Sequence, residues 1–238
     1  MPQTARRASS RPGDPGAAGV ADEAPLATGL SPTTVSRLPV YLRVLDLLSQ
    51  SGVETISSVA LAEAVGVTPS QLRKDLSHLG SYGTRGVGYH IALLQAQIGR
   101  EFGTTREWPV VIIGVGNLGR ALAGYAGFAH RGFRIAALVD PDPAVVGSTV
   151  HGVPVSDLAE LEAVIARTKA TIAVLATPPE AAQSVVDRVV SQGVTSILTF
   201  AATVLAVPEG VIVRKVDLGQ ELQILAYYEQ RKSEGVAR

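Results

Sequence analysis

The 238-residue chain contains no cysteine, and this absence excludes several kinds of chemistry. Without cysteine a protein has no disulfide framework, no zinc site built on thiolates and no thiol nucleophile. Aromatic residues make up only 5% of the chain, so a core must be built mainly from aliphatic side chains. The hydrophobic content of 46% is ample for such a core.

The chain also lacks net charge, because 21 lysines and arginines balance 21 aspartates and glutamates. A protein coated in positive charge for a phosphate backbone would show a basic excess, so any nucleic-acid surface must be local. No apolar run approaches the roughly 18 residues of a membrane span, and no apolar core of a signal peptide follows Arg6, Arg7 and Arg11. We therefore expect a cytoplasmic protein without a membrane partner.

Residues 1–32 are rich in proline, glycine, alanine and serine. They contain too little apolar material to offset the entropy lost on ordering. We interpret this segment as a disordered tail, and we favour solvated arginines over a specific arm for DNA.

Two helices are predicted after the tail. Apolar residues recur at helical spacing from about residue 34 to residue 51, and Pro39 is expected to interrupt this helix near its start. A shorter helix is predicted over residues 58–65 and is ended by Gly66.

A third helix follows almost at once and has a well-marked start. Thr68 can cap it, Pro69 suits the first helical position and Gln71 completes a capping-box pattern. The next segment, residues 80–89, has four glycines in ten residues and is interpreted as a short hairpin. The spacing of the second and third helices, with this hairpin as a wing, is typical of a winged helix-turn-helix.

The third helix would then be the recognition helix. Its leucines form a buried stripe, which leaves polar and basic residues at its N-terminal end free to meet phosphates and base edges. An arginine at the hairpin tip could enter a minor groove. On charge alone a solvated helix face would explain these residues better, but the helix-turn-helix spacing favours DNA. The predicted DNA-binding residues are Ser70, Gln71, Arg73, Lys74, Arg85 and Gly86.

Beyond a fourth amphipathic helix and a polar linker, short apolar runs alternate with helical ones. Strands are predicted at 110–113, 135–139, 171–175, 196–199 and 211–213, and helices at 118–130, 158–168 and 180–192. Continuous apolar strands separated by helices imply a parallel sheet covered on both faces. We predict an α/β protein with a winged helix-turn-helix (33–103), a Rossmann-type doubly wound domain (104–216) and a C-terminal helix and tail (217–238).

The turn after the first strand of this sheet has the glycine pattern of a dinucleotide site. Gly114 permits a tight turn, Gly116 lets the backbone approach a pyrophosphate, and Gly119 lets the helix pack closely on the strand. Asp140, 21 residues past Gly119, can accept hydrogen bonds from ribose hydroxyls and repel a 2′-phosphate, which favours NAD(H) over NADP(H). The alternative is a doubly wound domain whose glycines only make the turn.

The loop after the strand at 171–175 is a candidate for the nicotinamide side of the nucleotide, because ligands collect at the carboxyl ends of such strands. A simple strand-to-helix turn is the alternative. The predicted nucleotide-binding residues are Gly114, Val115, Gly116, Asn117, Leu118, Gly119, Asp140, Thr177 and Pro178.

A dehydrogenase needs a proton donor or acceptor beside the nicotinamide. The four histidines, at positions 78, 90, 130 and 151, are poorly placed for that role, and the second half leaves no room for a substrate domain. We therefore predict a sensor without catalytic residues or a metal. The alternatives are an NAD-dependent oxidoreductase with an accessory N-terminal domain and a nucleotide- or CoA-binding module that regulates through protein contacts.

Five segments together resemble one bacterial family, the redox-sensing transcriptional repressors called Rex. They are residues 36–43, 70–76, 86–89, 114–119 and 216–222. The resemblance implies a homodimer with N-terminal winged helices, NAD(H)-binding Rossmann domains and a last helix swapped between the subunits. It also implies double-stranded operator DNA with an inverted repeat as partner, with NADH releasing the DNA and NAD+ competing for the same site.

The resemblance further implies a switch. In the family an arginine of the first helix, an aspartate just before the swapped helix and a tyrosine of the Rossmann helix form it, and the matching positions are Arg43, Asp217 and Tyr125. Tyr125 is accordingly added to the predicted nucleotide-binding residues. From the residues alone, Arg43 is a surface charge, Asp217 an N-cap for the last helix and Tyr125 a core residue, and these roles are compatible with the switch.

Overall fold

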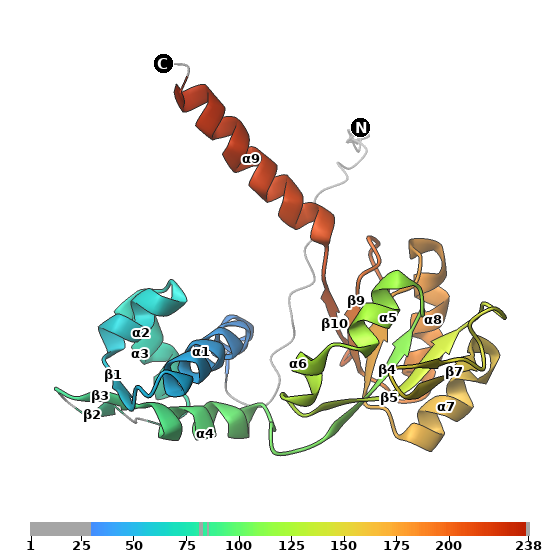
Figure 1. Ribbon diagram of the computed structural model, residues 1–238, viewed down its shortest axis with the longest axis horizontal. Helices are drawn as coiled ribbons and strands as arrows, with labels where there is room; N and C mark the ends of the chain where they lie inside the picture. The colour runs from blue at the N-terminus through green and yellow to red at the C-terminus, as the bar shows by residue number, and fades with distance from the viewer. Residues whose placement is uncertain (1–29, 81–82, 85, 237–238) are drawn as a thin grey trace, which may run out of the picture.

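The computed structural model describes residues 30–80, 83–84 and 86–236. A helical part with a small sheet comes first, a larger sheet covered by helices follows, and a long last helix projects away from both (Figure 1). In the described range, no helix is long and apolar enough to cross a membrane.

The first part is a helical cluster with a three-stranded antiparallel sheet. Its helices are α1 (Pro32–Gln50), α2 (Ser58–Val65), α3 (Pro69–Ser77) and α4 (Ile91–Glu101). Its strands are β1 (Thr55–Ile56), β2 (Gly83–Thr84) and β3 (Gly88–His90), in the order β1-β3-β2. The predicted hairpin is confirmed as β2 and β3, whereas the pairing of β1 with β3 was not predicted.

The helix starts follow their capping residues. The Thr68 hydroxyl accepts a hydrogen bond of 3.1 Å from the backbone N–H of Gln71, and Ser31 caps α1 in the same way. Gly66 ends α2 in the left-handed region, at φ 74°. Aliphatic side chains from all four helices, with Tyr41 from α1, fill the core between them.

The expected interruption at Pro39 is wrong, because α1 continues through this residue. Proline removes one helical hydrogen bond and disfavours a helix interior by about 3 kcal/mol. Leu38, Tyr41 and Leu45, on both sides of the proline, are fully buried, and their burial outweighs that local cost.

The second part is a seven-stranded sheet in the order β10-β9-β8-β4-β5-β7-β6. The strands are β4 (Trp108–Ile113), β5 (Phe133–Asp140), β6 (Thr149–Val150), β7 (Val153–Asp157), β8 (Ile172–Leu175), β9 (Ser196–Thr199) and β10 (Ile212–Lys215). Only β6 is antiparallel to its neighbour, and β6 and β7 were not predicted. In chain order the six parallel strands follow the 3-2-1-4-5-6 arrangement of a Rossmann fold, with the reversal of direction between β4 and β8.

Helices cover both faces of this sheet. α7 (Leu161–Thr168) and α8 (Pro179–Ser191) pack on the face that contains Val111 and Leu175. The opposite face, with Ile112 and Val174, packs against side chains of α5 (Asn117–Ala123). A short 3-10 helix, η1 (Leu158–Glu160), precedes α7.

The single helix predicted over 118–130 is wrong in its extent. The structure has α5, which ends at Ala123, and a separate short helix α6 (Ala126–Ala129). The ring of His151 lies where a side chain at Gly124 would lie, and Tyr125 has an extended backbone with ψ of 103°, which cannot continue a helix.

The last helix, α9 (Leu218–Val236), starts directly after β10 at the edge of the sheet (Figure 1). It carries large apolar side chains that are 44–66% exposed in the single chain: Leu218, Leu222, Ile224, Leu225, Tyr227 and Tyr228. A helix with such a surface is typical of one that a partner covers.

Candidate nucleotide-binding and nucleic-acid-binding sites

The glycine-rich turn lies between β4 and α5, at the carboxyl end of the central strand. Gly114 has φ of 95°, and a Cβ there would lie 2.5 Å from the carbonyl oxygen of Ala176. A Cβ at Gly119 would collide with the carbonyl oxygen of Gly114, so α5 packs directly on the turn. Around Gly116, by contrast, the space is open. The backbone is thus tight at two glycines and accessible at the one predicted to face a pyrophosphate.

Asp140, at the end of β5, holds this turn. Its Oδ2 accepts a hydrogen bond of 2.6 Å from the backbone N–H of Val115, and its Oδ1 accepts one of 2.8 Å from the N–H of Asp142. The residue is only 9% exposed. Each carboxylate oxygen keeps acceptor capacity, so shaping the turn and accepting a ribose hydroxyl are compatible roles.

The loop after β8 meets the glycine turn at the point where the strand order reverses. The N–H of Ala176 donates to the carbonyl of Ile113 at 2.8 Å, and Pro178 directly precedes α8. The Thr177 hydroxyl is buried and has no hydrogen-bond partner within the part of the chain that the structure describes. Leaving a buried hydroxyl unpaired is costly, so Thr177 is a suitable group to bond a ligand here.

The first turn of α5 adds two more of the predicted residues. Asn117 begins the helix, and Leu118 is 36% exposed. No side chain caps this helix at Gly116, so its first amides are not taken by a capping side chain. The predicted residues on the turn, at the end of β5 and in the loop after β8 are therefore gathered at one edge of the sheet.

Tyr125 lies elsewhere on the surface of the second part. Its side chain is 54% exposed, which contradicts a core position, and its ring meets that of Phe128 edge-on at 5.1 Å. It lines a cavity of about 600 Å³ together with His151 and Arg106. The glycine turn contributes no lining residue to that cavity.

Arg43 and Asp217 belong to different parts of the chain, the first helix and the segment between β10 and α9. Arg43 is exposed on α1. Asp217 accepts a hydrogen bond of 3.1 Å from the N–H of Gln220, as an N-cap of α9, and pairs with Lys215 at 3.2 Å. The hydrogen bond from the Gln220 amide lowers the pKa of Asp217, and the hydrogen bond from Lys215 lowers it further. Among the described residues, neither Arg43 nor Asp217 has a hydrogen bond or an ion pair with Tyr125.

The predicted DNA-binding residues occupy α3 and the wing. Ser70, Arg73 and Lys74 are exposed, as is Gly86 in the turn between β2 and β3. Arg73 donates a hydrogen bond of 3.3 Å to the Ser58 hydroxyl at the start of α2. It also lines a surface cavity of about 530 Å³ with residues of β2, β3 and their turn. Arg85 lies outside the described residues.

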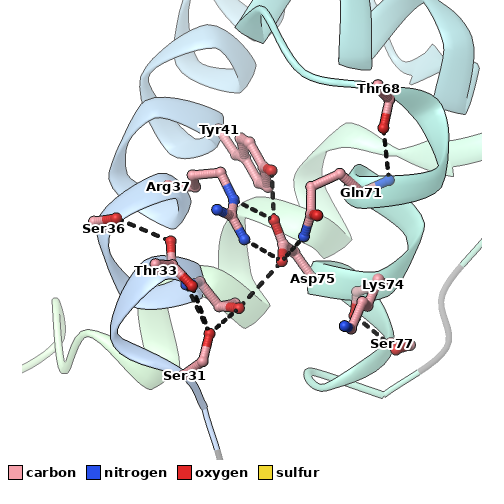
Figure 2. Close-up of polar contacts among 11 residues, drawn as sticks. Ser31, Thr33, Ser36, Arg37, Tyr41, Thr68, Gln71, Lys74, Asp75 and Ser77 are labelled. Carbon is pink, nitrogen blue, oxygen red and sulfur yellow. Dashed lines mark hydrogen bonds and ion pairs between the residues drawn. The ribbon is translucent and has the colours of Figure 1, made fainter.

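A buried carboxylate that the sequence analysis missed ties α3 to α1 (Figure 2). Asp75 of α3 accepts hydrogen bonds from Arg37 at 2.7 and 2.8 Å, from Tyr41 at 2.7 Å and from Thr34 at 3.1 Å. Gln71, expected to face DNA, donates its side-chain amide to the same carboxylate at 2.9 Å. Every donor except Gln71 comes from α1.

The ionised state of Asp75 is strongly favoured. Burial alone would raise the pKa of Asp75, but the hydrogen bonds from Arg37, Tyr41, Gln71 and Thr34 outweigh it and lower the pKa to about 2. Burial, and after it the hydrogen bond to the Asp75 carboxylate, raises the pKa of Tyr41 against the opposing effect of Arg37. The group is therefore a charged carboxylate in the core of the first part, with its hydrogen bonds satisfied.

Two family models match separate stretches of the chain. One, described as a CoA binding domain, matches residues 105–203, and the other, described as a putative DNA-binding protein N-terminus, matches residues 29–77. The redox-sensing transcriptional repressor Rex of Streptomyces avermitilis is 60% identical over 205 residues, covering 86% of this chain and 81% of that protein. The Streptomyces coelicolor repressor of the same name is also 60% identical, covering 86% and 80%.

Solved structures of similar fold cover most of the chain, including both of its parts. A crystal structure of RSP with beta-NAD+ and operator DNA has a TM-score of 0.81 and 35% identity, and covers 87% of this chain and 96% of that chain. A crystal structure of RSP with beta-NADH has a TM-score of 0.81 and 34% identity, covering 88% and 98%. RSP is described as a Rex-family repressor.

Proposed function

The chain belongs to the Rex family of redox-sensing transcriptional repressors, and we propose that it binds operator DNA when NADH is low and leaves the DNA when NADH binds. One observation carries this proposal. A winged helix-turn-helix and a Rossmann sheet occur in one chain that is 60% identical to such repressors over 86% of its length. NADH and NAD+ are the sensed ligands.

In the proposed nucleotide site, the pyrophosphate lies against Gly116 and the first amides of α5 (Asn117, Leu118 and Gly119), and the adenosine ribose lies against Asp140. The open space at Gly116 and the unpaired Thr177 hydroxyl suit such a ligand. Thr177 and Pro178 would face the nicotinamide side. NAD+ and NADH differ there by a hydride and one charge, so an apolar surrounding that disfavours the cation would discriminate between them.

In the proposed DNA interface, α3 enters a major groove and the wing follows the backbone. Arg73 and Lys74 neutralise phosphates, Ser70 and Gln71 lie at the end of the helix that reads bases, and Arg85 with Gly86 contacts the minor groove. We assign this interface to a winged-helix domain over 33–103, the nucleotide to a domain over 104–216, and the C-terminal helix and tail to 217–238.

We further propose a homodimer on an inverted repeat. The apolar side chains of α9 are exposed in the single chain, which supports a second copy as their cover. If α9 is swapped, Asp217 of one copy can approach Arg43 and Tyr125 of the other. NADH then acts by binding better to the arrangement that cannot place two recognition helices about 34–36 Å apart.

The relatives are regulators, and we propose that this chain likewise turns over no substrate. Since operator DNA is its partner, we place it in the cytoplasm. The test is a gel shift on A·T-rich inverted repeats titrated with NADH and with NAD+. We expect NADH to release the DNA and NAD+ to oppose that release; equal binding with and without saturating NADH would contradict the proposal.

A further inference from the structure

The orientation of the Gln71 amide is set by Asp75. The two residues are one helical turn apart on α3, and Gln71 Nε2 donates to Asp75 Oδ1 at 2.9 Å (Figure 2). An ionised carboxylate can only accept hydrogen bonds, so the nitrogen of the amide must face it. The carbonyl oxygen of Gln71 is thereby turned away from Asp75.

Asp75 cannot easily rotate to release this bond. Its side chain is fully buried, and both of its oxygens accept hydrogen bonds from Arg37. Tyr41 fixes Oδ2 and Thr34 fixes Oδ1 from the same neighbouring helix. The carboxylate is therefore a rigid reference point, held by α1, for the side chain of Gln71.

What remains free on Gln71 is one N–H and the carbonyl oxygen. Within the described residues neither has another partner, and Gln71 is the third residue of α3. In the major groove adenine presents an acceptor, N7, beside a donor, the N6 amino group, and glutamine binds this pair through its amide. The free groups of Gln71 match that pair.

We propose that Asp75 is a positioning residue that sets the base preference of α3 by presenting the Gln71 amide to an adenine of the operator. This inference rests on the proposed function, because it takes α3 as the helix in the major groove. Asp75 itself touches no base. It acts through Gln71, and α1 supplies the hydrogen bonds that keep it in place.

The experiment is a sequence selection from a randomised inverted-repeat library, followed by affinity measurements, with wild type, Gln71→Ala, Asp75→Asn and the double variant. The wild type should prefer adenine at one position of each half-site by roughly 5- to 150-fold. Gln71→Ala should lose this preference. Asp75→Asn should weaken it, because an amide at position 75 can also donate to the Gln71 oxygen and no longer fixes the orientation.

The double variant separates positioning from a general structural role. If Asp75 acts through Gln71, Asp75→Asn changes no base preference once Gln71 is alanine. An adenine preference that survives Gln71→Ala overturns the inference. The inference is also overturned if Asp75→Asn changes the base preference as much in the Gln71→Ala background as in the wild type. Tyr41→Phe is the matched control, because it removes one bond to Asp75 and leaves the Gln71 contact.

A second measurement needs no variant of Asp75 and covers the case in which Asp75→Asn does not fold. In ¹⁵N-labelled wild type, the Gln71 Hε2 proton that faces Asp75, assigned with Gln71→Ala, should be shifted downfield of the usual glutamine range and should exchange slowly with water. Ordinary glutamine shifts with fast water exchange of both protons overturn the inference. If the wild type binds no operator or ignores NADH, the proposed function fails and this inference with it. If NADH releases the DNA normally but Gln71→Ala and Asp75→Asn leave the base preference unchanged, this inference alone fails.

Discussion

The two halves of the molecule are held in shape by different interactions. In the first, a buried side-chain carboxylate with four donor residues joins α3 to α1. In the second, the edge of the sheet that carries the glycine turn depends on close backbone contacts at Gly114 and Gly119 and on backbone amides that donate to Asp140. The first half should therefore be sensitive to lost side-chain groups, and the second to added ones.

The largest effect is expected from Asp75→Ala. It leaves Arg37, Tyr41 and Thr34 without their common acceptor, and breaking a buried pair in this way costs about 3–5 kcal/mol. Calorimetry should show a lower melting temperature of the first part. The control is Asp46→Ala. Asp46 also accepts a hydrogen bond between two helices, from Gln95 of α4 to α1, but this contact is exposed. Equal melting temperatures for the two variants would break the comparison.

The next effect is expected from Gly119→Ala. The new Cβ would collide with the carbonyl oxygen of Gly114, so α5 must shift away from the turn. Overpacking of this kind costs about 1–3 kcal/mol, and NADH affinity should fall by about 5- to 150-fold while DNA binding without NADH persists. NADH fluorescence titration measures this. With Gly116→Ala, where the space is open, NADH affinity should fall without a loss of thermal stability.

Acid should weaken the first half. Because the pKa of Asp75 is lowered to about 2, its contribution to stability is complete above the ordinary aspartate pKa near 4 and is lost as pH falls through 2. The loss amounts to about 2 kcal/mol. Far-ultraviolet circular dichroism at pH 2–5 should show it, and Asp75→Asn should remove this part of the pH dependence. An unchanged pH profile in that variant would contradict the ionised state.

The smallest effect is expected from Arg73→Ala. This variant removes an exposed cation that, within the described residues, donates a hydrogen bond to the Ser58 hydroxyl alone. Operator affinity should fall, and the slope of log affinity against log salt should decrease by about 0.9, the value for one phosphate contact. NADH affinity in the absence of DNA should be unchanged. A change in NADH affinity would show that the two halves are not separable in this respect.

Periodicity and turn residues predicted most of the fold, because the strongly apolar strands and the capped helices depend on local sequence. The glycine turn and Asp140 follow the same logic. The exceptions were decided by contacts far apart in the chain. Burial of Leu38 and Tyr41 keeps α1 continuous through Pro39. At the end of α5, the His151 ring occupies the space that a side chain at position 124 would need.

Asp75 shows the limit of sequence reasoning most clearly. It lies between leucines of a buried stripe, and its partners Thr34, Arg37 and Tyr41 are spaced along one face of a helix some 40 residues earlier. The spacing of those donors was a usable signal, but a charged residue on a helix is usually solvated. Only the packing of α1 on α3 brings the two sets together.

The central claim is that NADH and operator DNA bind different arrangements of one molecule. Thermodynamic linkage then requires DNA to weaken NADH binding by the same factor as NADH weakens DNA binding. The direct measurement is the NADH dissociation constant of the full chain with and without saturating operator DNA, compared with the DNA dissociation constant with and without NADH. We predict two equal factors, both well above one; an NADH affinity that is unchanged by operator DNA would contradict the account.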